Sequence, residues 1–182
     1  MNVTTGIRRI AIIGPECTGK SDLSEFLARF FNTVWVPEFA RTYIGNLDRP
    51  YDRSDLLTIA KGQLALEDEL AAKANELLIC DTNLYVIKVW SQFKFGSVDQ
   101  DILRALEARR YDLYLLTDID IPWEADPQRE HPDKRVELFE MYRNEMLKQP
   151  VPFAIISGAR EMRRSTAKKC IENLKTRIGK TT

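Results

Sequence analysis

The sequence predicts an α/β fold in which a five-stranded parallel sheet lies between two layers of helices. Short, almost continuously apolar runs rich in β-branched residues recur along the chain, helical patterns separate them, and 182 residues suffice for one sizeable core. The runs are residues 8–14, 33–37, 77–81, 112–118 and 152–158. No repeat, low-complexity tract or linker divides them, so we expect a single domain over residues 1–182.

Composition narrows the classes of function. The 27 basic and 27 acidic side chains balance, so no net field favours nucleic acid or an anionic membrane surface. The three cysteines lie far apart without a CxxC pair, which argues against zinc and against a disulfide framework. The first ten residues lack the apolar stretch of a signal peptide, and no run approaches a membrane span. We expect a soluble, cytoplasmic protein with no nucleic-acid or membrane partner, its oligomeric state left open.

The first apolar run leads into GPECTGKS, residues 14–21, which matches the phosphate-loop pattern GxxxxGK[ST] at every fixed position. A strand precedes the motif and an amphipathic helix follows it, so we expect a P-loop NTPase that binds ATP and Mg²⁺. Lys20 reaches the β- and γ-phosphates, Ser21 is the expected magnesium ligand, and Cys17 is expected to fill space, with a redox-sensitive thiol as the alternative. A plain glycine turn is the alternative for the whole motif. The expected nucleotide-binding residues of the loop are Gly14, Pro15, Glu16, Cys17, Thr18, Gly19, Lys20 and Ser21.

Helical patterns occupy the stretches between the runs. The second long pattern, which begins at Leu56, brings Gln63 and Glu67 into its inward stripe, so two buried polar groups need partners. The stretch 83–95 is ambiguous between strand and helix, and we expect a helix because Asn83 can cap it. Another helix is predicted over residues 98–109.

The third run ends in LLICDTN, which places Asp81 at the end of a strand. A carboxylate there can hold magnesium directly or through water. The alternative is that Asp81 caps the following helix, and the two roles are compatible.

The second run is followed by VPEFARTY, in which Glu38 and Arg41 lie three residues apart and face the same crevice on a helical turn. Ligands gather at the carboxyl ends of strands in such sheets. A carboxylate there can orient or deprotonate a substrate hydroxyl, and a guanidinium can hold the phosphate being delivered. The alternative is a surface ion pair.

A mixed-charge loop after the fourth run leads into another helix, and together they predict a helical lid over about residues 122–148. Its Arg129 is expected to close over the phosphates. Arg135 lies near the helix N-terminus, where the dipole disfavours cations, so an anion is its expected neighbour. His131, the only histidine, is expected to be exposed. An ordinary solvated loop is the alternative. The residues expected to face inward from the helix are Leu138, Phe139, Tyr142 and Met146.

The fifth run is followed by ISGAREMRRS, a natural place for a loop beside the adenine ring, with Gly158 and Arg160 as candidate nucleotide contacts. From Arg160 to Lys180 eight basic residues face only two acidic ones. No aromatic residue is interleaved to stack bases, so we expect a solvated helix face.

Five segments, IAIIGPECTGKSDL, VPEFARTYI, IAKGQLALEDE, LLICDTN and DIPWEADPQRE, resemble in order and spacing the kinase domain of the NadR-type proteins. That family is the ribosylnicotinamide kinase branch of the P-loop kinases, close to AAA-like ATPases. The resemblance covers about residues 8–174. It implies ATP-dependent phosphorylation of the 5′-hydroxyl of nicotinamide riboside to nicotinamide mononucleotide.

The resemblance also implies roles for individual residues. Lys20 and Ser21 serve ATP and magnesium, Asp81 matches the strand-end aspartate, Glu38 and Arg41 match an acidic and basic pair, Arg129 matches the lid arginine, and Trp123 and Asp126 match a PW…D stretch. The acceptor would be a pyridinium cation, which suits an indole face and nearby carboxylates. Gln63 is the candidate reader of its carboxamide or of a base amide.

Two departures from the family pattern are visible. Larger NadR proteins carry an adenylyltransferase domain, and some a helix-turn-helix, ahead of the kinase; this chain is expected to have neither. Pro127 stands where a glycine is expected, which would stiffen the lid.

Three functions stay open at this point. The leading one is a small-molecule kinase whose catalytic residues are Lys20, Glu38, Asp81, Arg129 and Arg135. The base is unassigned between Glu38 and Asp81, and positioning is expected to outweigh deprotonation. The second changes the acceptor to a deoxynucleoside, nucleoside or nucleotide. The third is a regulatory switch in which ATP or GTP closes the lid without transfer.

Overall fold

The computed structural model describes residues 6–178, so residues 1–5 and Lys180 of the basic tail lie outside the described residues. The elements along the chain are β1 (Arg8–Ile13), α1 (Lys20–Phe30), β2 (Trp35–Val36), α2 (Phe39–Gly45), α3 (Arg53–Ala71), β3 (Leu77–Asp81), α4 (Leu84–Phe95), α5 (Gln100–Ala108), β4 (Leu113–Thr117), the 3₁₀ turn η1 (Pro132–Lys134), α6 (Arg135–Lys148), β5 (Phe153–Ile156) and α7 (Arg160–Ile178). The five predicted strands are confirmed, and so are the helices predicted over 83–95 and 98–109.

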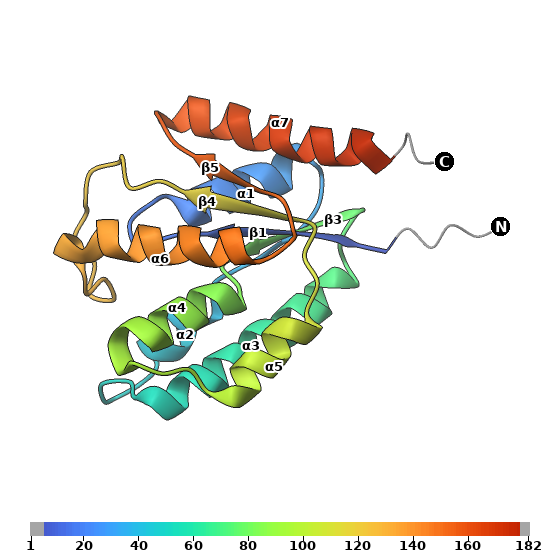
Figure 1. Ribbon diagram of the computed structural model, residues 1–182. Helices are drawn as coiled ribbons and strands as arrows, with labels where there is room; N and C mark the ends of the chain where they lie inside the picture. Colours follow the sequence, from blue (N-terminus) through green and yellow to red (C-terminus); the bar gives the residue numbers. More distant parts are fainter. Residues whose placement is uncertain (1–5, 179–182) are drawn as a thin grey trace.

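The strands form one parallel sheet in the order β2-β3-β1-β4-β5. Helices α1 and α7 cover one face, and α3, α4, α5 and α6 lie on the other (Figure 1). The chain leaves β1 toward β3 and β2 on one side and toward β4 and β5 on the other. That switch in strand order opens a crevice at the carboxyl ends of the central strands, where ligands bind in such folds.

The core explains why the central parts of the strands are almost continuously apolar. Alternate side chains of β1 enter opposite layers: Ile10 and Ile12 pack with α1 and α7, while Ala11 and Ile13 pack toward α4 and α6. All four are fully buried. Because both faces are covered, the four positions from Ile10 to Ile13 are all occupied by apolar residues.

Hydrogen bonds at a helix cap and to buried side chains hold α4 and α3 in place. The Asn83 side chain accepts a hydrogen bond from the Tyr85 N–H at 3.0 Å, so Asn83 and not Asp81 caps α4. The two polar residues on the inward stripe of α3 both have partners. Gln63 Oε1 accepts from the Phe39 N–H at 2.9 Å, and Glu67 Oε1 accepts from the Tyr111 hydroxyl at 2.8 Å.

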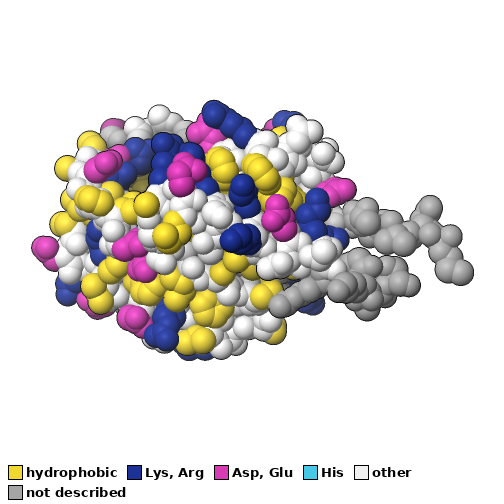
Figure 2. Space-filling view, turned by 90° about the horizontal axis from the view of Figure 1, so that it is seen from above, with side chains coloured by type: hydrophobic (Ala, Val, Ile, Leu, Met, Phe, Trp, Pro, Cys, Tyr) yellow, Lys and Arg dark blue, Asp and Glu magenta, His cyan; other side chains and the backbone are white. Residues whose placement is uncertain are grey.

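Several basic side chains of helix α7 form ion pairs with acidic side chains. Arg160 and Arg164 pair with Asp22, and Lys175 lies 2.9 Å from Glu76. Figure 2 looks onto the α7 side and shows lysine and arginine side chains interspersed with acidic and apolar ones. Within residues 6–178, no helix combines the length and the apolar character needed to cross a membrane.

Candidate active site

The phosphate loop, residues 14–21, is shaped by contacts with β4. Gly14 has a φ of 140°, and a Cβ there would lie 2.5 Å from Thr117 Oγ1 and 2.8 Å from the Thr117 carbonyl oxygen, so only glycine fits. The buried Thr18 hydroxyl donates to the Pro15 carbonyl at 2.8 Å and lies 2.7 Å from Thr117 Oγ1. These contacts set the shape of the loop.

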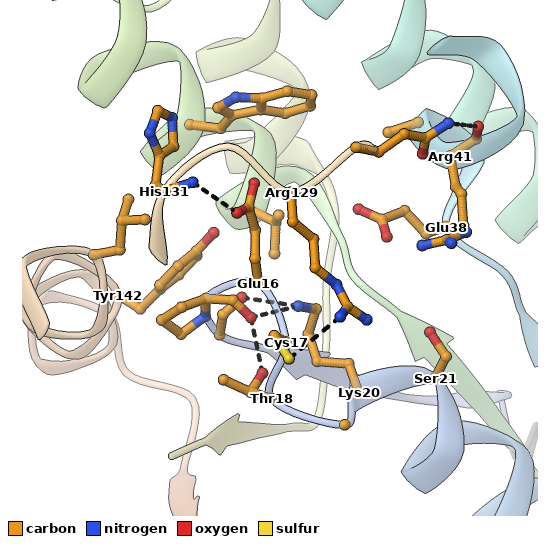
Figure 3. Close-up of a pocket in the computed structure, with 18 of the residues that line it drawn as sticks. Glu16, Cys17, Thr18, Lys20, Ser21, Glu38, Arg41, Arg129, His131 and Tyr142 are labelled. Carbon is orange, nitrogen blue, oxygen red and sulfur yellow. Dashed lines mark hydrogen bonds between the residues drawn. The ribbon is translucent and has the colours of Figure 1, made fainter. Parts of the chain in front are cut away.

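The N-terminus of α1 is open toward the crevice. Its cap residue, Gly19, has a φ of 76° and offers no side chain to the free N–H groups of the first turn. Those groups and the helix dipole make a binding place for an anion. Lys20 Nζ arches back over the loop and donates to the carbonyls of Gly14 at 3.1 Å and Pro15 at 2.7 Å (Figure 3).

Asp81 lies at the end of β3, opposite Ile12 in the register of the sheet. Ser21 Oγ donates to Asp81 Oδ2 at 2.5 Å. Asp81 is buried, its Oδ1 has no hydrogen-bond partner in the structure, and burial together with the charge of Glu38 raises its pKa to about 7.

These two residues fit a divalent cation. A hydroxyl and a buried carboxylate oxygen without a partner are the hard oxygen ligands that Mg²⁺ takes, and it usually completes its shell with water and phosphate oxygens. Within the described part of the chain, no group of three or more His, Cys, Asp or Glu side chains could hold a metal. Ser21 and Asp81 would therefore share the ion with the nucleotide.

One pocket of about 320 Å³ joins the phosphate loop to a chamber between α2, α4 and the lid, which we define as residues 122–148. Its volume suits a small molecule. Glu38, at the N-cap of α2, and Glu16 supply carboxylates to it, and Figure 3 shows Arg129, His131 and Tyr142 facing the same space.

Arg41 lies at the rim of this chamber and is held by the lid. Its Nη2 lies 2.6 Å from Asp126 Oδ2, and its carbonyl accepts from Gln128 Nε2 at 3.1 Å. The ion pair that the sequence allowed between Glu38 and Arg41 is therefore replaced by one between α2 and the lid. Asp126 does not line the pocket; it holds Arg41.

The lid arginines bond to the loop carbonyls and thiol. Arg129 lines the pocket and donates to Cys17 Sγ at 3.3 Å and to the Glu124 carbonyl. Arg135 does not line it: its guanidinium donates to the carbonyls of Ile121 at 3.0 Å and Cys17 at 3.1 Å. The anion expected beside Arg135 is thus replaced by two carbonyl oxygens, which offset the unfavourable helix dipole.

Two aromatic side chains of the lid differ from expectation. Trp123 does not line the pocket, and its ring centroid lies 5.9 Å from Arg135 Cζ. His131 was expected to be exposed, which is wrong: its side chain is 24% exposed and its ring packs edge-on against Phe93 of α4 at 4.9 Å. The cause is the packing of the lid against α4.

Three further candidates lie outside the pocket. Gln63 is buried, and its side-chain amide forms hydrogen bonds with the backbone of Pro37 and Phe39. The Gly158 N–H donates to Asp120 Oδ2 at 2.5 Å, and Arg160 pairs with Asp22. A role of Gly158 and Arg160 beside the adenine stays a prediction.

Sequence reasoning missed most of the chamber wall. Val86 and Trp90 line it from α4, and Leu138 and Tyr142 line it from α6. Each pair is spaced i, i+4, so both members share one helix face. The usable signal was that α4 directly follows Asp81, so its first turns lie at the same crevice.

Arg163 is the other missed residue. It is 6% exposed and donates to the carbonyls of Thr18 at 2.9 Å, Asp118 at 2.9 Å and Gly158 at 2.8 Å. It lies on the same stripe of α7 as Ala167 and Ile171, so a charge on an apolar stripe was the available signal. Its side chain joins the phosphate loop to the loops after β4 and β5.

The strand order, the phosphate loop and the strand-end acid together define a P-loop nucleotide-binding protein with a kinase-like fold. The chain matches the family described as AAA domain over residues 9–163 and belongs to that family. The resemblance to NadR is also confirmed. The chain is 30% identical over 127 residues to the trifunctional NAD biosynthesis/regulator protein NadR of Salmonella typhimurium, a match covering 68% of this chain and 31% of that protein.

Solved structures agree on the fold. A NadR protein in complex with NR superposes with a TM-score of 0.74 at 19% identity, covering 93% of this chain and 51% of that one. The complex of a NadR protein with NAD and AMP-PNP gives 0.73 at 20% identity, with 93% and 50% covered. Thymidylate kinase from Ehrlichia chaffeensis gives 0.65 at 15% identity, with 91% and 99% covered. This chain spans less than a third of the curated relative and about half of the NadR structures.

Proposed function

We propose that this protein transfers the γ-phosphoryl group of ATP to the 5′-hydroxyl of nicotinamide riboside. The observation that carries the proposal is a pocket that joins an intact phosphate loop to a chamber with aromatic walls and two carboxylates. The relative that is 30% identical is a NAD biosynthesis protein, and structural neighbours were solved with NR and with AMP-PNP.

The chamber suits a nucleoside that carries a positive charge. Trp90 and Tyr142 offer aromatic faces, which attract a pyridinium ring. Glu16 and Glu38 add negative charge to the same space, and burial together with the charges of Glu38 and Glu16 raises the pKa of Tyr142. Nicotinamide riboside is a cation with a flat ring, so both features favour it.

A nucleotide acceptor fits less well. Its phosphate would need a free arginine or lysine on the acceptor side. Arg41 is already paired with Asp126, and Lys20 lies on the loop that would hold ATP. Glu16 and Glu38 would repel the phosphate.

The residues divide the work of phosphoryl transfer. The backbone of residues 14–19 and Lys20 would hold the β- and γ-phosphates, and Arg129 would lie over the transferring group. Ser21 and Asp81 would hold Mg²⁺, which supplies charge neutralisation between the phosphates when bound. Glu38 would orient the 5′-hydroxyl and accept its proton as the phosphoryl group arrives.

The test is product analysis with ATP, Mg²⁺ and nicotinamide riboside. We expect nicotinamide mononucleotide and ADP in equal amounts, identified by mass spectrometry and ³¹P NMR. Glu38→Gln should lower kcat while ATP binding is kept, and Asp81→Asn should raise the Mg²⁺ concentration needed for half-maximal rate. ATP hydrolysis at a rate indifferent to nicotinamide riboside would contradict the proposal and favour the regulatory switch.

A further inference from the structure

We propose that the side chain of Glu16 is a positioning residue that fastens the lid over the acceptor. Its backbone belongs to the phosphate loop, but its carboxylate points away from the loop toward the lid (Figure 3). The identity of the acceptor that Glu16 helps to position rests on the proposed function, but the contact between Glu16 and the lid does not.

The contact is a carboxylate that accepts two backbone hydrogen bonds. Glu16 Oε2 accepts from the N–H of Glu130 at 3.0 Å and from the N–H of His131 at 3.2 Å. Hydrogen bonds from N–H groups to an ionised acceptor are stronger than neutral ones. Both donors lie in the lid just before η1, more than a hundred residues along the chain from Glu16.

The neighbouring residue makes the loop a broader dock for the lid. Cys17 Sγ accepts from the Glu124 N–H at 3.1 Å and from Arg129 Nη1 at 3.3 Å, and the Cys17 carbonyl accepts from Arg135 Nη2 at 3.1 Å. Together the two consecutive loop residues accept five hydrogen bonds from the lid. Lid position is thereby tied to the segment that would hold the triphosphate.

The side chain of Glu130 reaches toward the aromatic wall of the chamber. Glu130 Oε2 accepts from the Tyr51 hydroxyl at 3.0 Å and lies 2.9 Å from Lys94 Nζ. The Tyr51 hydroxyl in turn accepts from Trp90 Nε1 at 2.9 Å, and Trp90 lines the chamber. A continuous line of contacts therefore runs from the phosphate loop through the lid to the aromatic wall.

Loss of the carboxylate should act on the acceptor before the nucleotide. In Glu16→Ala the two lid N–H groups lose their acceptor, so the lid segment that carries Glu130 is held less firmly against Tyr51 and Trp90. We expect the KM for nicotinamide riboside to rise about tenfold with the KM for ATP within about twofold, and acceptor-independent ATP hydrolysis to increase because a looser lid admits water.

The direct test is amide hydrogen exchange at Glu130 and His131, followed by NMR in the full chain with no acceptor present. We expect exchange at both amides to be roughly tenfold faster in Glu16→Ala, and intermediate in Glu16→Gln, whose amide oxygen still accepts. Glu140→Gln is the matched control, because it removes a lid carboxylate that pairs only with Arg143 on its own helix. That variant should leave both amides unchanged.

The outcomes separate this inference from the proposed function. Faster exchange at the two amides without phosphorylation of nicotinamide riboside supports the Glu16 contact and removes the proposed acceptor. Phosphorylation of nicotinamide riboside with exchange in Glu16→Ala equal to that of the parent overturns the role of Glu16. The role of Glu16 is also overturned if, in both Glu16→Ala and Glu16→Gln, the KM for ATP rises as much as the KM for nicotinamide riboside.

Discussion

The two sides of the crevice are built in different ways. The donor side is one stretch of eight residues, 14–21, together with Asp81 on the neighbouring strand. The acceptor side draws on α2, α4 and the lid, including α6, and its residues are spread from Glu38 to Tyr142. The donor side would act mainly through backbone groups and a helix end, and the acceptor side would act through side chains.

On the proposed function, that difference separates phosphate binding from acceptor selectivity. A backbone cradle recognises phosphates whatever molecule carries them, because every N–H is the same donor. The acceptor side would select by shape and charge, and the lid supplies part of its wall. Changes on one side should therefore leave the binding constant of the other ligand nearly unchanged, except at Glu16, whose backbone lies on the donor side and whose carboxylate bonds to the lid.

The largest effect is expected on the donor side. Lys20→Ala removes the cation over the phosphates and should lower kcat about 10³-fold. Its Nζ bonds only two loop carbonyls, so thermal unfolding should shift little. Steady-state kinetics and calorimetry measure both, with Lys73→Ala, which loses only a surface pair with Glu69, as the control. A kcat within threefold of the parent would contradict the assignment of the loop.

A second prediction concerns a residue on neither side. Burial raises the pKa of Glu67 to about 7 from an ordinary value of 4.5. Between these pH values the folded state binds more protons than the unfolded state, so the free energy of unfolding falls as pH rises, by roughly 3 kcal/mol. Glu67→Gln should abolish this loss.

Denaturant unfolding at pH 5 and pH 8 measures the effect of Glu67. The free energy of unfolding of the parent should fall relative to that of Glu67→Gln between about pH 4.5 and pH 7, and the two curves should run parallel above that range. Both KM values should stay unchanged, since Glu67 bonds to Tyr111 and not to the pocket. An equal pH slope in both proteins would show that Glu67 is charged in the fold.

The acceptor side is tested by Trp90→Ala. Loss of the indole face should cost about 2 kcal/mol of acceptor binding, or roughly 30-fold in its KM, with the KM for ATP unchanged. Trp90→Phe keeps an aromatic face but loses the hydrogen bond to Tyr51, so it should lie between. If the KM for ATP rises as much as that of the acceptor, the separation of the two sides is wrong.

The smallest effect is expected at Gly62 of α3. A Cβ there would overlap the ring of Phe39, the first residue of α2. The gain in helix propensity of Gly62→Ala, about 1 kcal/mol, should be outweighed by the overpacking. We expect a slightly lower melting temperature and an acceptor KM raised a few-fold, because α2 carries Glu38. A gain in stability with an unchanged KM would show that Phe39 moves freely.

The same contrast explains what the sequence could predict. The strands, the phosphate loop and the Asn83 cap depend on neighbours in the chain, and their patterns are local. The partners of Arg41, Arg135 and Arg163 come from segments far along the chain, so no local pattern names them. Trp90 and Tyr142 occupy positions with the spacing of ordinary core residues, and only the packing of α4 against α6 places them at a cavity.

The proposed acceptor is tested by the ratio of kcat/KM for nicotinamide riboside to kcat/KM for thymidine and for thymidine monophosphate, measured with ATP and Mg²⁺ under one set of conditions. The charged chamber and the occupied Arg41 predict a ratio of about 10² or more in favour of nicotinamide riboside. A ratio below one for either thymidine compound would contradict the account and make the protein a deoxynucleoside or nucleotide kinase.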